Sequence, residues 1–396
     1  MFVWEREDWP NFRIDAVKLI EPIAEARFRQ GRFAELMSSI GFDDRLQSEY
    51  AATVDDVIKT SAIEGESLNP ANVRSSIARR LGIPDGGLTP ADRKIEGVVE
   101  MILDATNNHK NPLTPARIQA WHAALFPTGY SGLSKIDIGR WRSDREGPMR
   151  VVSGQGGRMR IHYEAPPAAA VPGEMRAFLN WLNRESDKVD PLIRAAIAHF
   201  WFVTIHPLDD GNGRIARAIA DYAIARSEGT GRRYYSLSSQ IAHDREAYYE
   251  ALERSQKGDV DLTDWVRWFV DCYIRALSNA ETTSRRIIAR SRFMSKVSAE
   301  RPLNARQHKA LTGFLKHPEE PITVRRWREV FGGDCSADTA LRDIADLVAR
   351  GALRKNAGGS KNTSYSIDLR ITELEEAPTV RIHAAEPVVE TAPRPR

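Results

Sequence analysis

The stretch HPLDDGNGRIAR, residues 206–217, joins two segments that have helical patterns. The segment before it, LIRAAIAHFWFVTI (192–205), is apolar nearly all round, which is typical of a buried helix. The segment after it, 214–226, alternates small and apolar residues with charge and predicts a second helix. The glycines between them therefore form a tight loop at a helix N-terminus, where unpaired N–H groups and the helix dipole favour an anion. We predict a phosphate site here.

The charged side chains of this loop suit phosphoryl-type chemistry. His206 ends the buried helix, and an imidazole that titrates near neutrality suits a general base acting on a Ser, Thr or Tyr hydroxyl. Asp210 offers the hard oxygen ligands that Mg²⁺ prefers. Arg214 and Arg217 are three residues apart, hence on one helix face, where both can grip a polyphosphate. Such transfer needs positioning and charge neutralisation more than covalent help.

The remaining polar and glycine positions complete the predicted nucleotide site. Gly211 and Gly213 allow a close approach of the backbone to phosphates, and Asn212 can donate its amide to a non-bridging oxygen. Two competing motifs, GxxxxGK[ST] and HExxH, are missing from the sequence.

The whole stretch closely resembles the signature of the Fic family, His-Pro-Phe-x-Asp/Glu-Gly-Asn-Gly-Arg-x-x-Arg. Every functional position matches, and the one departure is Leu208, where the family usually has Phe. We expect Leu208 to pack inward, so that the change concerns the core more than the chemistry. Fic enzymes typically transfer the AMP part of ATP to a hydroxyl of a target protein. The resemblance thus implies a protein adenylyltransferase that uses ATP and Mg²⁺, with Arg217 on the γ-phosphate.

A second Fic signature lies far upstream, at TSAIEG (60–65). It resembles the inhibitory motif [Ser/Thr]-x-x-x-Glu-[Gly/Asn] found N-terminal to many Fic cores. Thr60 and Glu64 are four apart, hence on one helix face, and Gly65 can end the helix. The resemblance implies that Glu64 pairs with Arg217, occupies the γ-phosphate position and holds activity low. The alternative is an ordinary glutamate at a helix end.

Two more segments resemble parts of a Fic active site. ERSQKGD (253–259) resembles the segment beside the adenine, so Tyr249 could stack on the base and Gln256 could bond its edge; ordinary helix packing is the alternative. Residues 149–163 predict a hairpin with a glycine-rich tip, the one hairpin signal of the catalytic region. In the family a corresponding flap holds the target by strand addition. A surface hairpin without a partner is the alternative.

Residues 301–370 have a pattern of their own. Helices are predicted over 304–314, 324–331 and 337–351, the last capped by Ser336, and two strands follow within 353–367. This order resembles a winged helix-turn-helix. The region holds thirteen Lys and Arg against eight Asp and Glu, a moderate excess for DNA binding. Candidate contacts to bases or phosphates are Thr339, Arg342, Lys355 and Lys361. A protein-interaction module is the alternative.

Composition bounds the remaining possibilities. The chain has 396 residues and a formal net charge of +3, so two to four domains are expected and no polyanionic partner is required. Cys272 and Cys335 have no metal-ligand spacing and cannot form a disulfide framework, which predicts two buried thiols. The sequence has no apolar leader and no run of about 18 apolar residues. We therefore expect a cytoplasmic protein without membrane contact.

These patterns together predict a mainly α-helical protein: a Fic-type core with a small β-hairpin flap, then a winged helix-turn-helix. The expected parts are an N-terminal helical region with the inhibitory motif (1–88), the catalytic core (89–275), a helical connector (276–300), the winged helix (301–370) and a disordered tail (371–396). The predicted function is adenylylation of a target-protein hydroxyl docked at the 149–163 hairpin. Two alternatives stay open: removal of AMP from a modified protein, and a DNA-binding regulator with a nucleotide-sensing Fic core. A homodimer also stays open.

Overall fold

The computed structural model describes residues 1–83, 92–145, 147–153, 160–184, 189–357 and 363–370. The chain divides into two compact units, Met1–Ile287 and Ile288–Arg396, and each has its own hydrophobic core. The predicted boundary between core and connector, at residue 275, falls inside one continuous helix, α11 (Thr263–Ser298). The predicted disordered tail, 371–396, lies outside the described residues.

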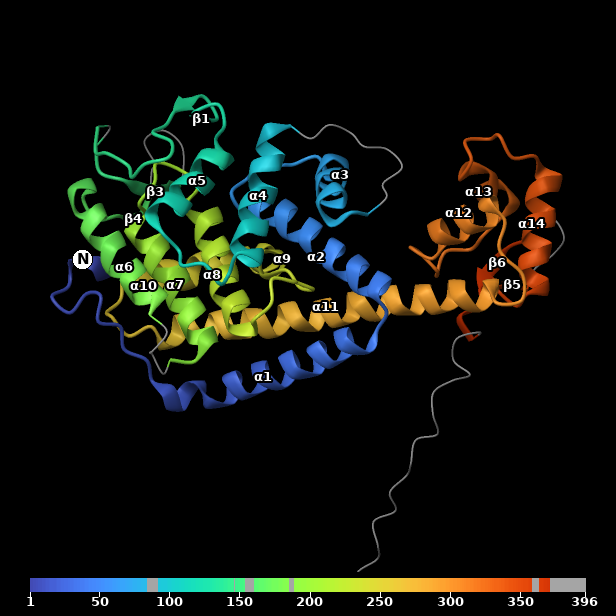
Figure 1. Ribbon diagram of the computed structural model, residues 1–396, viewed down its shortest axis with the longest axis horizontal. Helices are drawn as coiled ribbons and strands as arrows, with labels where there is room; N and C mark the ends of the chain where they lie inside the picture. The colour runs from blue at the N-terminus through green and yellow to red at the C-terminus, as the bar shows by residue number, and fades with distance from the viewer. Residues whose placement is uncertain (84–91, 146, 154–159, 185–188, 358–362, 371–396) are drawn as a thin grey trace, which may run out of the picture. The chain divides into compact units, whose positions relative to one another are not determined.

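Unit 1 is mainly helical, which confirms the predicted fold class (Figure 1). Its helices, besides the first part of α11, are α1 (Ala16–Ser39), α2 (Phe42–Ile63), α3 (Pro70–Leu81), α4 (Arg93–Asn107), α5 (Pro115–Leu125), α6 (Val171–Asn183), α7 (Pro191–Ile205), α8 (Asn212–Glu228), α9 (Leu237–His243) and α10 (Arg245–Gln256), with 3-10 turns η1 (Val3–Glu5) and η3 (Ala168–Ala170).

Helix α7 is the buried centre of unit 1. All of its residues from Ala195 to Ile205 are buried, and α6 and α8 pack against it. Burial of each large apolar side chain contributes about 1.5–3 kcal/mol, so this helix fixes the place of the loop that follows it. The predicted all-round apolar helix is confirmed, and Leu208 just beyond it is fully buried as expected.

The N-terminal helices bring a distant segment to this loop. In Figure 1, α1 runs alongside α11, and Arg29 and Arg32 of α1 bond Ser278 and Glu281 of α11 at 2.8 and 3.1 Å. Helix α2 then returns across the molecule and packs on α4, α8 and α9. Its C-terminal end at Ile63 therefore lies near the start of α8.

The described residues of unit 1 form two small antiparallel hairpins. The predicted one consists of β3 (Arg150–Ser153) and β4 (Arg160–Glu164), and its predicted tip, 154–159, lies outside the described residues. The other pairs β1 (Tyr130–Ser131) with β2 (Ser134–Lys135) and was not predicted. Two residues per strand are too few to show the alternation that marks a strand in a sequence.

Unit 2 contains α12 (Ala305–Phe314), α13 (Val324–Glu329), α14 (Ala337–Ala349) and the antiparallel pair β5 (Leu353–Lys355) and β6 (Tyr365–Ile367). The predicted helices and strands are thus present, and Ser336 caps α14 by accepting a hydrogen bond from the backbone N–H of Thr339. Trp327 is fully buried in the core of this unit.

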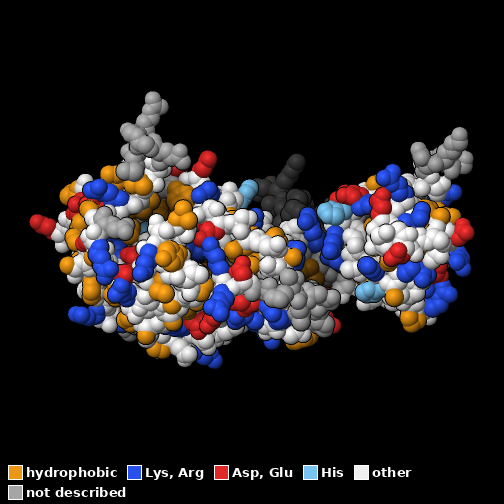
Figure 2. All heavy atoms as spheres, turned by 90° about the horizontal axis from the view of Figure 1, so that it is seen from above, with side chains coloured by type: hydrophobic (Ala, Val, Ile, Leu, Met, Phe, Trp, Pro, Cys, Tyr) orange, Lys and Arg blue, Asp and Glu red, His pale blue; other side chains and the backbone are white. Residues whose placement is uncertain are grey.

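The distribution of surface charge agrees with the small net charge of the sequence. Figure 2 shows Lys and Arg side chains interspersed with Asp and Glu over the visible face.

None of the helices in the described part of the chain has the length and apolar character needed to cross a bilayer. Cys272 and Cys335 are both buried free thiols, as predicted.

Candidate active site

The loop between α7 and α8 turns sharply at His206. This residue adopts a left-handed conformation with φ of 51°, which few residues other than glycine adopt, and its N–H donates to Phe202 O at 3.0 Å. Arg142 fixes the turn from outside: its Nε donates to His206 O at 2.7 Å, and its backbone N–H donates to Pro207 O at 2.9 Å. The strained turn persists because these contacts determine it from both sides.

The imidazole of His206 is set up as a neutral base. Its Nδ1 lies 3.1 Å from Val203 O, and since a carbonyl only accepts, Nδ1 must carry the ring proton. Nε2 is then the basic nitrogen. Burial is the main cause that lowers the pKa of His206, to about 4, and the nearby Arg142 adds to it. The ring is therefore unprotonated and able to accept a proton at neutral pH.

Arg142 is a residue of this candidate site that the sequence did not reveal. Its side chain is fully buried and also donates to Pro166 O and, at 3.1 Å, to Asp144. Burial lowers the pKa of Arg142, and the neighbouring Asp144 partly offsets this. Arg142 thus joins the His206 turn to the segment that leads into β3.

Asn212 has a different role from the predicted one. Its Nδ2 donates to Leu208 O at 2.7 Å, and its Oδ1 accepts from the Leu208 N–H at 3.0 Å. The buried carboxamide therefore closes the loop instead of pointing at a phosphate. What Asn212 offers an anion is its backbone N–H, which belongs with those of Gly213 and Arg214 to the first turn of α8.

Asp210 lies half-buried at this helix N-terminus. Its Oδ2 accepts from Ser131 of β1, and its Oδ1 accepts from the Gly211 N–H. The neighbouring Asp209 is turned away and accepts from the Asp137 N–H at 2.7 Å. Each carboxylate oxygen of Asp210 keeps a lone pair, and one carboxylate beside a phosphate site is the usual protein share of a Mg²⁺ site. The donor set therefore fits the predicted metal.

Arg217 and the end of α2 meet in a buried contact. Arg217 Nε donates to Thr60 Oγ1, and its Nη2 donates to Thr60 O and to Glu64 Oε1, all at 2.8 Å. Arg217 is 1% exposed, and the side chain of Glu64 is 30% exposed. Burial lowers the pKa of Arg217, and the nearby Glu64 carboxylate raises it. The net shift is upward, so the guanidinium stays charged.

The carboxylate of Glu64 also covers the N-terminus of α8. A Cβ built on Gly213 would lie 2.2 Å from Glu64 Oε1 and 3.2 Å from Arg217 Nη1. Any side chain at 213 would therefore require this carboxylate to shift from its observed position. Gly211 is required for another reason, since its φ is 81° and a Cβ there would meet the Phe126 ring at 3.0 Å.

A second carboxylate from the same segment holds the other arginine. Arg214 is 1% exposed, lies over the Phe126 ring at 4.9 Å, and donates from Nη1 to Glu66 Oε2 at 2.9 Å. Glu66 also pairs with Lys94 of α4 at 3.0 Å. The segment after α2 therefore neutralises both arginines of the loop. The sequence did not reveal Glu66, because it lies outside the resembling motif.

The two predicted adenine contacts differ in access. Tyr249 is 37% exposed, its ring lies beside the Arg245 guanidinium at 5.6 Å, and its hydroxyl is 3.4 Å from Ile63 O. Gln256 is buried, and its Nε2 is 3.4 Å from Thr204 Oγ1. Tyr249 thus has a face available to a base, whereas Gln256 is packed against the end of α7.

The predicted DNA contacts and a group of possible metal ligands lie in unit 2. Arg342 and Lys355 are exposed, the Thr339 hydroxyl bonds Ser336 at 2.9 Å, and Lys361 lies outside the described residues. DNA binding stays a prediction.

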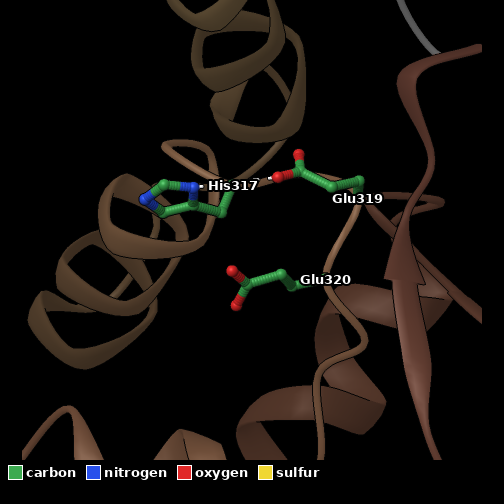
Figure 3. Close-up of side chains that lie close together, drawn as sticks. All are labelled: His317, Glu319 and Glu320. Carbon is green, nitrogen blue, oxygen red and sulfur yellow. Dashed lines mark ion pairs between the residues drawn. The ribbon is translucent and has the colours of Figure 1, made fainter.

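A separate exposed group comprises His317, Glu319 and Glu320 (Figure 3). Glu320 already pairs with Arg326, and we assign this group no function.

Comparison with known families agrees with the geometry of the loop. Residues 112–224 match the model of the Fic/DOC family, and residues 2–83 match the model of a domain of unknown function (DUF4172). The chain therefore carries a Fic domain, with the α7–α8 loop and both flanking helices inside or at the edge of the matched region.

Several known proteins are similar to this chain. A protein adenylyltransferase Fic of Aedes aegypti is 26% identical over 271 residues, 66% of this chain and 48% of that protein. One of Drosophila virilis is 32% identical over 222 residues, 54% of this chain and 40% of that protein. The chain thus spans about half the length of these curated relatives or less. A Fic family protein of Desulfovibrio desulfuricans G20, 20% identical, superposes with a TM-score of 0.53 over 89% of this chain and 96% of that one, which shows a shared fold.

Proposed function

We propose that this protein transfers the AMP part of ATP to a Ser, Thr or Tyr hydroxyl of a target protein. The observation that carries the proposal is a combination at the α7–α8 loop. A neutral imidazole, with Nε2 as its basic nitrogen, is followed after the loop by the N-terminus of α8, and two buried arginines lie in the first turns of that helix. This set offers a base to a hydroxyl and binds a polyphosphate beside it. The relatives named protein adenylyltransferase support the same reaction.

In this reaction the hydroxyl oxygen attacks the α-phosphorus of ATP, the bond to the β-phosphate oxygen breaks, and pyrophosphate leaves. Nε2 of His206 accepts the hydroxyl proton. The first-turn N–H groups of α8 hold phosphate oxygens, and Arg214 and Arg217 offset the charge of the β- and γ-phosphates. Tyr249 would lie against the adenine. The edge of the β3–β4 hairpin would hold the target segment by strand addition.

Asp210 is the residue that would hold Mg²⁺, which neutralises phosphate charge when bound. Its carboxylate lies beside the N-terminus of α8 and is oriented by Ser131. The protein's own part is to keep this carboxylate in place next to the phosphates.

In this proposal, the observed arrangement of Glu64 and Glu66 corresponds to an inactive resting state of the enzyme. Arg217 is held by Glu64 and Arg214 by Glu66, so neither guanidinium is available to a γ-phosphate. ATP would then bind without its productive phosphate geometry, and turnover would be slow until the segment after α2 moves away.

The test uses the full chain and ATP that carries the label in either of two positions. Transfer of AMP predicts that adding the protein to the lysate increases the protein-bound label from the α-phosphorus, whereas protein-bound label from the γ-phosphorus stays at the level of the lysate alone. Gel autoradiography of a cell lysate incubated with the protein measures both. An increase in label from the γ-position alone, relative to the lysate without the protein, would show phosphoryl transfer and would overturn the proposal.

A change at Asp210 tests the metal. In Asp210→Asn we expect the Mg²⁺-dependent rate to fall at least about tenfold and the affinity for ATP in Mg²⁺ to weaken, because the hard anionic ligand is lost. Asp209→Asn is the matched control, since Asp209 faces the Asp137 N–H. Titration calorimetry with and without Mg²⁺ measures the affinity. Equal Mg²⁺ dependence in wild type and Asp210→Asn would exclude this role.

A further inference from the structure

A serine, a histidine and a glutamate form a hydrogen-bonded chain outside the phosphate loop. Ser153, at the end of β3, lies with its Oγ 2.6 Å from Nε2 of His162 in β4. Nδ1 of the same ring lies 2.7 Å from Oε2 of Glu253 in α10. A nucleophile within hydrogen-bond distance of a base, which a third group orients, is the arrangement that activates a hydroxyl.

A β-bulge creates this arrangement. Val151 pairs with Tyr163 and Val152 pairs with Ile161, so His162 is the extra residue of β4. A bulge redirects the side chain of the extra residue. Side chains alternate along a strand, so Val152 and Ile161, both exposed, share one face of the hairpin. Ser153 belongs to the other face, where His162 meets it.

Glu253 determines which nitrogen of His162 is basic. A hydrogen bond from Lys257 at 2.5 Å, with others from His162 and Arg160, lowers the pKa of Glu253 to about 2 despite some burial. An ionised carboxylate only accepts, so Nδ1 carries the proton and Nε2 accepts from the Ser153 hydroxyl. Glu253 would also stabilise the imidazolium that forms when the serine loses its proton.

The hairpin is fastened near the proposed transfer site. Tyr163 of β4 donates from its hydroxyl to Thr204 O at 2.6 Å, two residues before His206. Arg160 of β4 bonds Glu253 at 3.0 Å, which ties the strand to α10. Ser153 is exposed, so a reactive phosphorus centre can reach its Oγ.

We propose that Ser153 is an activated nucleophile and the acceptor of an adenylyl group in self-modification of this protein. The proposal rests on the adenylyl transfer proposed above. Ser153 Oγ attacks the α-phosphorus of ATP bound at the phosphate loop of the same or a second copy, the bond to the β-phosphate oxygen breaks, and pyrophosphate leaves. The serine proton passes to Nε2 of His162. The product carries AMP on the hairpin that would otherwise hold a target, so modification would limit target binding.

The first experiment tests the nucleophile without ATP. The full chain is treated with diisopropyl fluorophosphate, and the modified serines are identified by peptide mass spectrometry. We expect an adduct on Ser153 whose formation slows about 10²-fold or more in His162→Gln, which removes the base. The exposed Ser134 of β2 is the matched comparison and should react at the slower rate. Equal reactivity of Ser153 and Ser134, or of wild type and His162→Gln, would overturn the proposal.

The second experiment tests the acceptor. The variant Glu64→Gly is incubated with ATP and a cell lysate, and the sites of added AMP on the variant and on lysate proteins are identified by mass spectrometry. We expect AMP on Ser153, and loss of that modification in Glu64→Gly/Ser153→Ala. AMP on target proteins but not on Ser153 would overturn the acceptor role and leave the proposed function standing. If no protein gains AMP, the proposed function and the acceptor role both fail, while the fluorophosphate reaction still decides whether Ser153 is activated.

Discussion

His206→Ala is expected to lower the rate of AMP transfer by about 10²–10⁴-fold, the range typical of a general base. ATP affinity should change little, because the imidazole acts on the attacking hydroxyl, and the phosphate contacts come from the first turn of α8. The measurement is labelling of lysate proteins other than the enzyme itself by α-labelled ATP, together with a separate binding titration. The left-handed turn should persist in the variant, because Arg142 holds it through the backbone oxygen of residue 206.

The pH profile gives an independent check of the same role. Burial lowers the pKa of His206 to about 4, so the neutral form is present above that pH. Protonation of His206 should therefore leave the rate unchanged from about pH 8 down to 5, and the rate should fall only as the pH approaches 4. An acidic limb centred near the ordinary value of 6.5 would show that the essential base is another group. An unchanged transfer rate in His206→Ala would exclude the role altogether.

The local part of this site was predictable from the sequence. The continuous apolar run of 192–205 and the glycines after it determine α7, the loop and α8, because these elements depend on neighbouring residues. Contacts made across long separations leave no such local pattern. Arg142, Ser131 and Glu66 reach the loop from 64, 79 and 148 residues away, respectively. Nothing near these residues in the sequence distinguishes them from other polar side chains.

Asn212 shows a second limit of sequence reasoning. An amide beside two glycines in a phosphate loop has the residue type of a ligand, yet its carboxamide closes the loop on Leu208. The two roles need the same residue at the same position, and only the direction of the side chain separates them. The bulge at His162 is similar, since one extra residue in a short strand cannot be recognised before the register is known.

Glu64→Gly is expected to raise AMP transfer by about tenfold or more, within the 5–150-fold range typical of coupling between a regulatory contact and a site. The reason is that loss of the carboxylate frees Arg217 Nη2 and uncovers the N-terminus of α8. An arginine suits a phosphate better than other cations because its donors form a rigid fork. Labelling of the protein itself and of lysate proteins by α-labelled ATP measures the gain.

Three further variants distinguish two explanations for a gain of activity in Glu64→Gly: loss of an inhibitory ion pair, and loosening of the C-terminal end of α2. Glu64→Gln keeps the size of the side chain and removes its charge, so it should also activate if the ion pair matters. Glu64→Gly/Arg217→Ala should lose the gain, because the freed guanidinium is what acts on the phosphate. Glu66→Gln should raise transfer further in the Glu64→Gly protein, since Glu66 holds the second arginine. If Glu64→Gly and Glu64→Gln label no faster than wild type, the pair with Arg217 is structural. If both instead slow the release of AMP from a labelled protein, Glu64 serves the removal reaction at this site.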